Sequence, residues 1–366
     1  MNSSKTTVVE PLTFAPLLKE RVWGGERLAE FGFVLPRGTP IGEAWVLADL
    51  PESTPDGRSV VDHGHHRGRT LREVIAASPR SILGRARAAE EGGFPLLLKL
   101  LDARENLSVQ VHPTAAYAKA HPGSHLKSEA WIVLDAAPGA VIYKGLHPDV
   151  DEARFRRDLA DRKVVADLVA VPVKPGDCHY LPSGTCHALG AGILVAEVQT
   201  PSDTTFRVYD WDRTGPRQRA LHIEESIECI FGPGSRHGEE RGVWQARPGD
   251  RGATIQSAGF RTTRLCATPH FSIERIDAIA ADDGRAGAPA ARATLPLATD
   301  DAPVAWMVLD GSVTLAGGND VRRLGRGRTV LIPAALRGWE AEFSPGASIL
   351  RIEVPTASDR MIAERR

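Results

Sequence analysis

The chain has 366 residues, of which 42% are hydrophobic and 25% are charged, and its formal net charge is −1. These values are those of an ordinary globular protein long enough for two or more domains. They give no reason to expect nucleic acid or an anionic membrane as a partner.

Targeting and redox signals are also weak. No segment reaches the roughly 20 apolar residues of a membrane span, and the first residues lack the apolar core of a signal peptide. The four cysteines form no CxxC pair, which predicts a reduced, cytoplasmic protein with small buried thiols rather than a thiolate zinc site: Cys178, Cys186, Cys229 and Cys266. The 35 glycines and 26 prolines predict many turns and a mainly β protein.

The first hundred residues read as short strands around one helix. "RVWGG" (21–25) and "IGEAWVLA" (41–48) are strand-like, and the polar stretch 51–69 predicts a loop. Leu71, Val74 and Ile75 have helical spacing behind the candidate cap Thr70, so we expect a helix over 70–83. "FPLLLKLLDA" (94–103) predicts a buried strand or strand pair.

The segment "LSVQVHP" (107–113) alternates between apolar and polar residues. Val109 and Val111 point to one side, and Ser108, Gln110 and His112 point to the other, which predicts a strand. The polar row is either the solvent face of an antiparallel sheet or a set of ligands inside a barrel.

Later elements suggest two similar domains. We expect helices at 147–170 and 221–231, a polar boundary at 232–252, and new strands from 270–277 to 349–355. The pattern Trp-x-Val-Leu-Asp occurs at 131–135 and again at 306–310, each time followed by a Gly, five residues and a Pro. The repeat predicts two barrels of one kind, in domains 1–245 and 255–366.

One hairpin pattern carries candidate metal chemistry. Gly176, Pro182, Gly184 and His187 form G-x5-P-x-G-x2-H, which resembles the second motif of the cupin family, where the His is a metal ligand. Together with Gln110, His112 and Glu129, His187 would give a donor set suited to zinc. A single His on a strand is more often a satisfied polar residue, but the pair with a Glu favours ligands. "HGHH" (63–66), His121 and His125 are interpreted as loop residues.

Several motifs in order make the resemblance more specific. "FPLLLKLLDARENLSVQVHP", "KSEAWIVLDA", "KPGDCHYLPSGTCHALGAGILVAEVQ" and "SDTTFRVYDWDR" resemble the type I mannose-6-phosphate isomerases in their short bacterial form. "VWGG" and "IGEAW" fit the same family, and the match covers most of residues 10–230 and weakly the rest.

The resemblance implies a fold and an activity. The fold is mainly β, with two cupin (jelly-roll) barrels and a small helical addition. The activity is the interconversion of mannose 6-phosphate and fructose 6-phosphate, by proton transfer through an enediolate with one Zn²⁺ per chain. A phosphosugar is then the expected partner, with no nucleic acid or membrane, and a monomer is favoured.

The resemblance also assigns residues. The zinc ligands fall on Gln110, His112, Glu129 and His187, the active-site arginine on Arg207, and the lysine before the metal glutamate on Lys127. Substrate-contacting groups fall on four further positions: Ser108, Glu197, Asp203 and Arg213. "EVQTPSD" and the loop 114–126 depart from the family pattern, which affects the pocket more than the metal site.

Roles within the reaction stay open at several positions. Glu197 is the leading candidate for the base, with Asp203, Lys127 and a metal-bound water as alternatives. Arg207 either holds the anionic part of the substrate or forms a rim ion pair with Asp210 or Asp212. In the second barrel Gly338 stands where the ligand His would be, so we expect a structural domain.

Two other functions fit a cupin barrel. An iron cupin dioxygenase would use ferrous iron and consume oxygen, and a sugar-binding cupin would bind without turnover. An isomerase assay with and without a chelator separates them.

Overall fold

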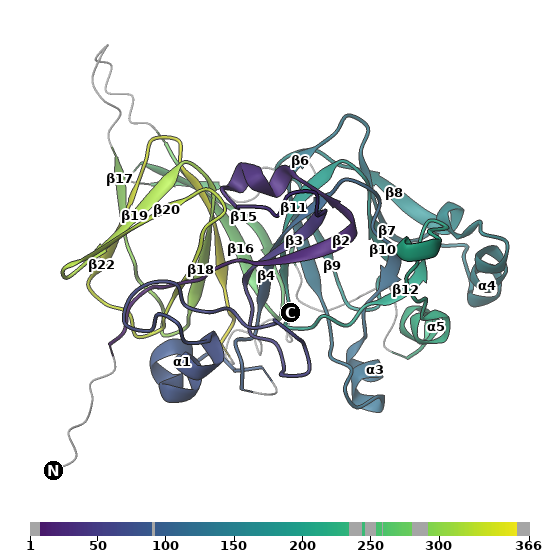
Figure 1. Ribbon diagram of the computed structural model, residues 1–366, viewed down its shortest axis with the longest axis horizontal. Helices are drawn as coiled ribbons and strands as arrows, with labels where there is room; N and C mark the ends of the chain where they lie inside the picture. Colours follow the sequence, from purple (N-terminus) through teal and green to yellow (C-terminus); the bar gives the residue numbers. More distant parts are fainter. Residues whose placement is uncertain are drawn as a thin grey trace.

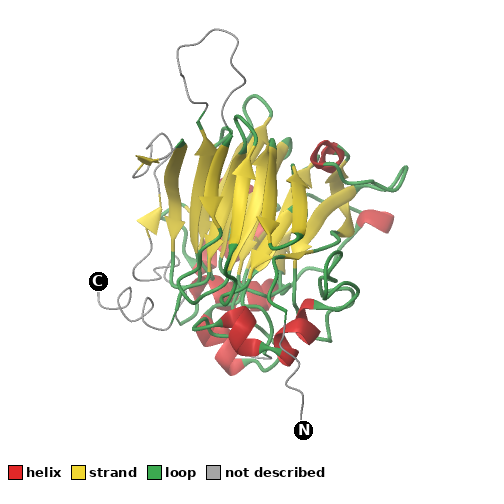
Figure 2. Ribbon diagram, turned by 90° about the vertical axis from the view of Figure 1, so that its left-hand side faces the viewer, coloured by secondary structure: helices red, strands yellow, loops and turns green. Residues whose placement is uncertain are grey.

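The computed structural model describes residues 8–89, 92–233, 244–245, 254–257, 259–279 and 292–356. Two antiparallel β barrels lie side by side, with the first to the right in Figure 1 and the second to the left. Most helices lie at one end of the strands (Figure 2). No helix within the described ranges is long and apolar enough to cross a membrane. The predicted mainly β fold with two cupin-like barrels is confirmed.

The first barrel consists of two sheets that enclose a lumen. The larger sheet has the order β2 (Leu17–Gly25), β3 (Ile41–Leu47), β4 (Leu97–Ala103), β11 (Ile193–Gln199), β6 (Glu129–Ala136), β9 (Cys178–Leu181). The smaller sheet has the order β12 (Phe206–Tyr209), β5 (Val109–Val111), β10 (His187–Leu189), β7 (Val141–Leu146), β8 (Leu168–Pro172).

The second barrel has the same plan. Its larger sheet has the order β1 (Leu12–Thr13), β21 (Thr329–Ile332), β18 (Val304–Asp310), β23 (Ser348–Glu353), β16 (Ser272–Ala278), β15 (Phe260–Ala267), with β13 (Trp244–Gln245) and β14 (Thr254–Ser257) both on β15. The smaller sheet has the order β17 (Ala293–Pro296), β22 (Trp339–Phe343), β19 (Ser312–Gly317), β20 (Asp320–Gly325).

The strand orders bear out the sequence repeat. The series β3-β4-β11-β6-β9 corresponds to β15-β16-β23-β18-β21, and β5-β10-β7-β8 corresponds to β17-β22-β19-β20. The two Trp-x-Val-Leu-Asp segments lie on β6 and β18, which hold the same place in their sheets. Strand β1, however, pairs with β21 through Leu12 and Leu331, so the beginning of the chain joins the second barrel. The predicted boundary between 245 and 255 lies mostly outside the described residues.

Helices cover the ends and one outer face of the barrels. They are η1 (Arg27–Phe31), α1 (Leu71–Ala77), α2 (Pro79–Leu83), α3 (Ala115–Ala120), α4 (Glu152–Ala160), η2 (Val164–Asp167), η3 (Gly215–Arg217) and α5 (Ile223–Phe231). The buried residues of α4 and α5 share one cluster with Val109, Val111 and Val208, which places both helices on the outer face of the smaller first sheet.

Two predicted helices differ from the structure. The helix expected over 70–83 is split at Ser78, because the following Pro79 disfavours a helical conformation there and begins α2. Thr70 caps α1 as predicted, in a capping box with Glu73. The helix expected over 147–170 is limited to α4 and η2, because residues 168–172 pair with β7 as strand β8.

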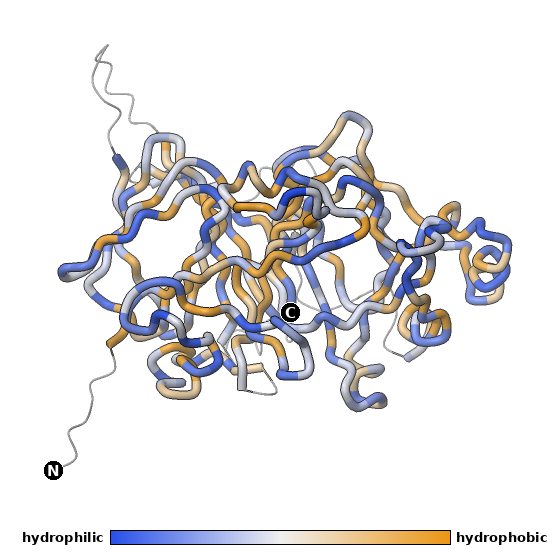
Figure 3. Tube along the Cα trace, viewed as in Figure 1, coloured by the Kyte–Doolittle hydropathy of each residue, from blue (hydrophilic) through white to orange (hydrophobic). Residues whose placement is uncertain are grey.

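Strand alternation divides the larger first sheet into two faces. Leu98, Leu100 and Ala196 point away from the lumen and pack with Met307 and Leu350 of the second barrel in one continuous core. This core appears as the hydrophobic band between the barrels in Figure 3. Residues of the opposite parity point into the lumen, where they meet side chains of the smaller sheet such as Ile142 and Leu189. The face toward the second barrel is therefore occupied by core packing, and the lumen face is the one that can hold a site.

Candidate metal and catalytic site

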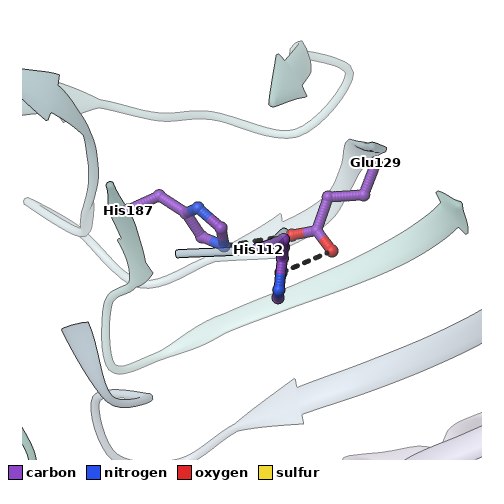
Figure 4. A group of neighbouring side chains, drawn as sticks. All are labelled: His112, Glu129 and His187. Carbon is purple, nitrogen blue, oxygen red and sulfur yellow. Dashed lines mark ion pairs between the residues drawn. The ribbon is translucent and has the colours of Figure 1, made fainter. Parts of the chain in front are cut away.

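Three predicted ligands meet in the lumen of the first barrel. His112 directly follows β5, Glu129 begins β6, and His187 begins β10. His187 lies opposite Gln110 in the ladder between β10 and β5, which brings the fourth predicted ligand to the same place. Figure 4 shows the side chains of His112 and His187 converging on the carboxylate of Glu129. The polar row of "LSVQVHP" thus faces a barrel interior and not solvent, and Ser108 and His112 are each only 1% exposed.

The donor atoms of this ligand cluster (Gln110, His112, Glu129 and His187) lie close together. His112 Nε2 is 3.2 Å from Glu129 Oε2, and His187 Nε2 is 3.3 Å from Glu129 Oε1. One donor atom from each of these three residues lies within 4.8 Å of the others, and all three are buried. No other group of this kind occurs among the described residues. His63, His65 and His66 of "HGHH" are among those residues and form no such group.

Backbone carbonyls fix the tautomer of both imidazoles. His112 Nδ1 donates to Thr204 O at 3.1 Å, and His187 Nδ1 donates to Thr185 O at 2.8 Å. Each Nε2 therefore carries a lone pair that points toward Glu129. Burial and the adjacent Lys127 lower the pKa of His112 to about 3, so this imidazole is neutral at physiological pH. Neutral imidazoles with free Nε2 lone pairs are what a metal ion requires.

Gln110 completes the cluster through its amide. Its Nε2 donates to His187 Nε2 at 3.4 Å, and its Oε1 accepts from Ser108 Oγ at 3.0 Å. A half-turn of the amide would bring Oε1 to the ligand side and let Nε2 donate to the Ser108 hydroxyl, which both donates and accepts. Ser108 thus orients Gln110 in either arrangement.

A lysine ammonium contacts the same lone pairs. Lys127 Nζ is 2.9 Å from Glu129 Oε2 and 3.0 Å from His112 Nε2. Burial alone would raise the pKa of Glu129, but the Lys127 ammonium outweighs it and holds that pKa well below its usual value. The cluster is therefore a buried, anionic, nitrogen-and-oxygen donor set that already attracts a cation, and it fits a divalent ion such as zinc.

A second group of buried charges lies beside the cluster on the larger sheet. Glu197 is 3% exposed, and its Oε1 accepts from Trp131 Nε1 at 2.9 Å. Its Oε2 lies 3.2 Å from Lys99 Nζ, which is also 3.7 Å from Glu43 Oε2. The Trp131 ring meets the His187 ring edge-on at 5.4 Å, so Glu197 is linked to the ligand cluster through one side chain.

Arg207 lies opposite Gln110 in the ladder between β12 and β5. Its neighbours Phe206 and Val208 pack on the outer side, so alternation turns Arg207 toward the lumen. Its Nε is buried without a hydrogen-bond partner. Burial and the nearby Arg219 lower the pKa of Arg207, but its guanidinium remains charged.

The two aspartates that follow Arg207 in the sequence pair with other arginines. Asp210 pairs with Arg213 and Arg219, and Asp212 lies 3.5 Å from Arg162. Within the described part of the chain, no ion pair holds Arg207. The interpretation as a rim ion pair is therefore wrong.

The remaining predicted residues, Asp203 and Arg213, form no hydrogen bond or ion pair with the ligand cluster among the described residues. Asp203 is exposed, on the segment between β11 and β12. Arg213 is held by Asp210 at 2.7 Å, by Glu105 at 3.5 Å and by the carbonyl oxygen of Asn106. None of these contacts reaches the ligand cluster.

Sequence reasoning missed the residues that surround Glu197: Arg21, Glu43, Lys99 and Trp131. Lys99 had a visible signal, because a lysine inside the apolar run "PLLLKLL" must be paired when the strand is buried. Glu43 has no such signal, since its partner is set by the register of β3 on β4.

The second barrel has a different interior. Val313, Leu315, Phe343 and Ile349 belong to an apolar cluster that fills the space between its two sheets. Gly338 precedes β22 at the place where His187 begins β10.

Comparisons with known proteins agree with this geometry. Residues 12–136 match the family model described as phosphomannose isomerase type I, catalytic domain. The chain is 35% identical over 341 residues to a mannose-6-phosphate isomerase from Streptococcus mutans, across 91% of this chain and 95% of that one. It is 42% identical over 228 residues to the mannose-6-phosphate isomerase ManA of Bacillus subtilis, across 61% and 69% of the two chains. The crystal structure of a mannose 6-phosphate isomerase from Bacillus subtilis is similar over 94% of this chain and 99% of that one, with a TM-score of 0.77 at 27% identity.

Proposed function

Because the chain belongs to the type I phosphomannose isomerase family, we propose that it interconverts mannose 6-phosphate and fructose 6-phosphate. The observation that carries the proposal is the buried meeting of His112, Glu129 and His187 in a lumen that also holds the unpaired Arg207. An aldose-ketose isomerase needs such a combination, because it must stabilise negative charge on oxygen while a proton moves between two carbons.

We assign the metal position to Gln110, His112, Glu129 and His187, and zinc is the ion that we propose. Bound there, a divalent cation would polarise the carbonyl of the open-chain sugar and favour the enediolate. The resident ammonium of Lys127 would have to leave His112 and Glu129, and it could then meet an oxygen of the substrate. Lys127 is thus a candidate substrate-binding cation.

We assign the proton transfer to Glu197. Burial, and next to it the charge of Glu129, raise the pKa of Glu197, which makes it a stronger base than an exposed carboxylate. Trp131 and Lys99 hold one oxygen each, so the carboxylate has a defined orientation. Asp203 is exposed and Lys127 contacts the ligands, and both are weaker candidates for the base.

Arg207 is proposed to bind the anionic part of the substrate. Its planar guanidinium can form two parallel hydrogen bonds with a phosphate or with the oxygens of the enediolate. Arg213 is tied to Asp210 and Glu105, so we infer that it supports the segment after β12.

We also propose that the protein is a cytoplasmic monomer. All four cysteines are buried and none forms a disulfide, as expected in a reducing compartment. Among the described residues, the large exposed hydrophobic side chains, such as Val34, Leu221 and Val321, come from separate parts of the sequence.

A coupled assay for fructose 6-phosphate formation, with and without a chelator, tests the proposal. We expect turnover that the chelator abolishes and that added zinc restores. Oxygen consumption with ferrous iron would identify a dioxygenase instead, and sugar binding without turnover would identify a binding protein. Either result would overturn the proposed activity.

A further inference from the structure

Charged residues form a row across the lumen face of the larger first sheet, and all of them except Arg21 are buried. The charged row consists of Arg21, Glu43, Lys99 and Glu197, which lie on β2, β3, β4 and β11. Glu197 is directly opposite Lys99 on one side and Trp131 on the other. The side chains of Lys99 and Glu43 are 4% and 9% exposed, so these charges compensate one another with little help from water.

The row contains one lysine between two carboxylates. Lys99 Nζ is 3.2 Å from Glu197 Oε2 and 3.7 Å from Glu43 Oε2, and it lies 5.2 Å from the centre of the Trp45 ring. Burial alone would lower the pKa of Lys99, but Glu197 and Glu43 outweigh it and raise the pKa above its usual value. Lys99 is therefore a permanent cation.

Glu43 is a permanent anion at the far side of Lys99. Arg21 Nε donates to Glu43 Oε1 at 2.7 Å, and Trp45 Nε1 donates to Glu43 Oε2 at 2.7 Å. Burial would raise the pKa of Glu43, but Lys99 and Arg21 outweigh it and lower the pKa to about 2. The attraction of Lys99 is thus shared between Glu43, whose pKa is lowered, and Glu197, whose pKa is raised.

The ionised state of Glu197 depends on Lys99 more strongly than the ionised state of Glu43 does. The titratable groups that face Glu197 are Lys99 from β4, Glu129 at the start of β6 and Lys127 just before it. Trp131 supplies a hydrogen bond but no charge. Without Lys99, a buried carboxylate close to the charge of Glu129 would retain its proton and could not accept one from a substrate.

We propose that Lys99 is a positioning residue, shared between Glu43 and Glu197, which orients the Glu197 carboxylate and keeps it ionised in the working enzyme. The inference rests on the proposed function, because it assumes Glu197 as the base. It adds that Glu43, which touches no ligand of the metal cluster in the structure, sets how strongly Lys99 acts on Glu197.

The proposal predicts opposite effects for two neighbouring substitutions. The acidic limb of kcat/KM against pH reports the pKa of the base in the free enzyme. Lys99→Met removes the compensating cation, so the limb should move to higher pH by roughly one pH unit or more. Glu43→Gln removes an anion and leaves Lys99 to Glu197 alone, so the limb should move to lower pH by roughly one pH unit.

The design separates this role from a merely structural one. Asp102→Asn is the matched control, since Asp102 is buried on the same strand as Lys99 but accepts from Arg27 N at 2.8 Å. The acidic limb of kcat/KM for Asp102→Asn should stay at the same pH. The metal content of every variant should be constant over the pH range used. If Lys99→Met does not fold, Glu43→Gln alone decides the question. Limbs that stay fixed, or that move in the same direction in both variants, would overturn the inference.

A direct titration keeps the result independent of the proposed activity. The infrared band of the protonated Glu197 carboxyl, identified by its loss in Glu197→Gln, should titrate at higher pH in Lys99→Met and at lower pH in Glu43→Gln. If the unaltered chain shows no isomerase activity, the proposed function fails, and the infrared shifts still decide whether Lys99 controls Glu197. An unchanged band position in both variants refutes the control itself.

Discussion

At the scale of single residues, Arg207 combines partial burial, charge and a buried Nε without a hydrogen bond. An arginine that is mostly removed from water usually has a carboxylate beside it, because an unpaired buried charge is costly. Here the two nearby aspartates are held by other arginines, and the Arg207 Nε remains without a partner. Because Arg207 lies opposite Gln110, its guanidinium is directed toward the ligand cluster.

Replacing Arg207 should therefore impair catalysis and leave the metal in place. Arg207→Ala should lower kcat by roughly 10²–10³-fold, as expected for loss of one preorganised donor, and Arg207→Lys should restore little of it. Arg162→Ala is the control, because that exposed side chain contributes only about 0–1 kcal/mol through its pair with Asp212. Normal kcat in fully metallated Arg207→Ala would refute the assignment.

The ligand cluster makes a stoichiometric prediction. Purified protein should contain about one divalent ion per chain. His112→Ala should lose it, because removing one Nε2 donor opens the cluster around Glu129. His65→Ala, in the exposed loop of "HGHH", should retain the full amount. Elemental analysis of the intact chains measures this, and metal that persists in His112→Ala at full stoichiometry would indicate a site elsewhere.

The residues of the site differ in how far sequence could predict them. His187 lies in a hairpin whose Gly and Pro spacing is local, so its inward orientation can be read from a few consecutive residues. Lys99 and Glu43 meet because β3 and β4 pair in one particular register, across more than fifty intervening residues. Pairing at that distance depends on the completed sheet, and no local pattern contains it.

At the scale of elements, "VWGG" owes its glycines to close strand approach. A Cβ on Gly24 would lie 2.4 Å from the backbone nitrogen of Gly42 on β3, and one on Gly25 would lie 2.2 Å from Asp102 Oδ2 on β4. The two glycines let the end of β2 approach both neighbours, where Gly25 pairs with Ile41 on β3 and Gly24 with Ala103 on β4. A motif that resembles a family signature thus has a simple packing reason.

Gly24→Ala should accordingly destabilise the fold. The new methyl group would meet backbone atoms, which cannot rotate away, and we expect a loss of about 1–3 kcal/mol in the free energy of unfolding. Gly325→Ala is the matched control, because a Cβ there has open space and the position lies in a strand. Urea titrations of both variants test the difference, and equal midpoints would count against the packing argument.

Element boundaries were less predictable than element types. Helix α5 and strands β5 and β16 lie where periodicity predicts them, because each buries one regular face, and β4 lies within the apolar run that predicts a buried strand. The helical insert ends earlier than predicted, because Leu168–Pro172 gains backbone partners on β7 that only the folded sheet provides. A charged, leucine-containing segment does not reveal such an edge strand by itself.

At the scale of the whole molecule, the two barrels share their main core. The cluster that contains Leu98 and Leu100 of the first barrel also contains Phe271, Met307 and Leu350 of the second. The rings of Tyr180 and Phe271 meet edge-on at 6.1 Å across this boundary. The barrels are therefore two parts of one hydrophobic unit, even though each has its own lumen.

We expect the barrels to unfold together. Phe271→Ala, at a fully buried position, should cost about 3–5 kcal/mol and lower the stability of both barrels equally. Hydrogen exchange followed by mass spectrometry reads the strands of each barrel separately. Loss of protection restricted to β16, β18 and β23, with β4, β6 and β11 unaffected, would show that the barrels are independent.

The pairing of β1 with β21 has a consequence for the newly made chain. Leu12 can reach Leu331 only after residue 331 has left the ribosome. Apart from β1, the second barrel contributes to the core around Leu98, Leu100 and Ala196 only with strands from β15 onward. A nascent first barrel thus carries an uncovered hydrophobic sheet for most of its synthesis, a state prone to aggregation. Premature termination before β23 should give insoluble fragments that chaperones retain, and the first barrel should not be obtainable as a separate soluble protein.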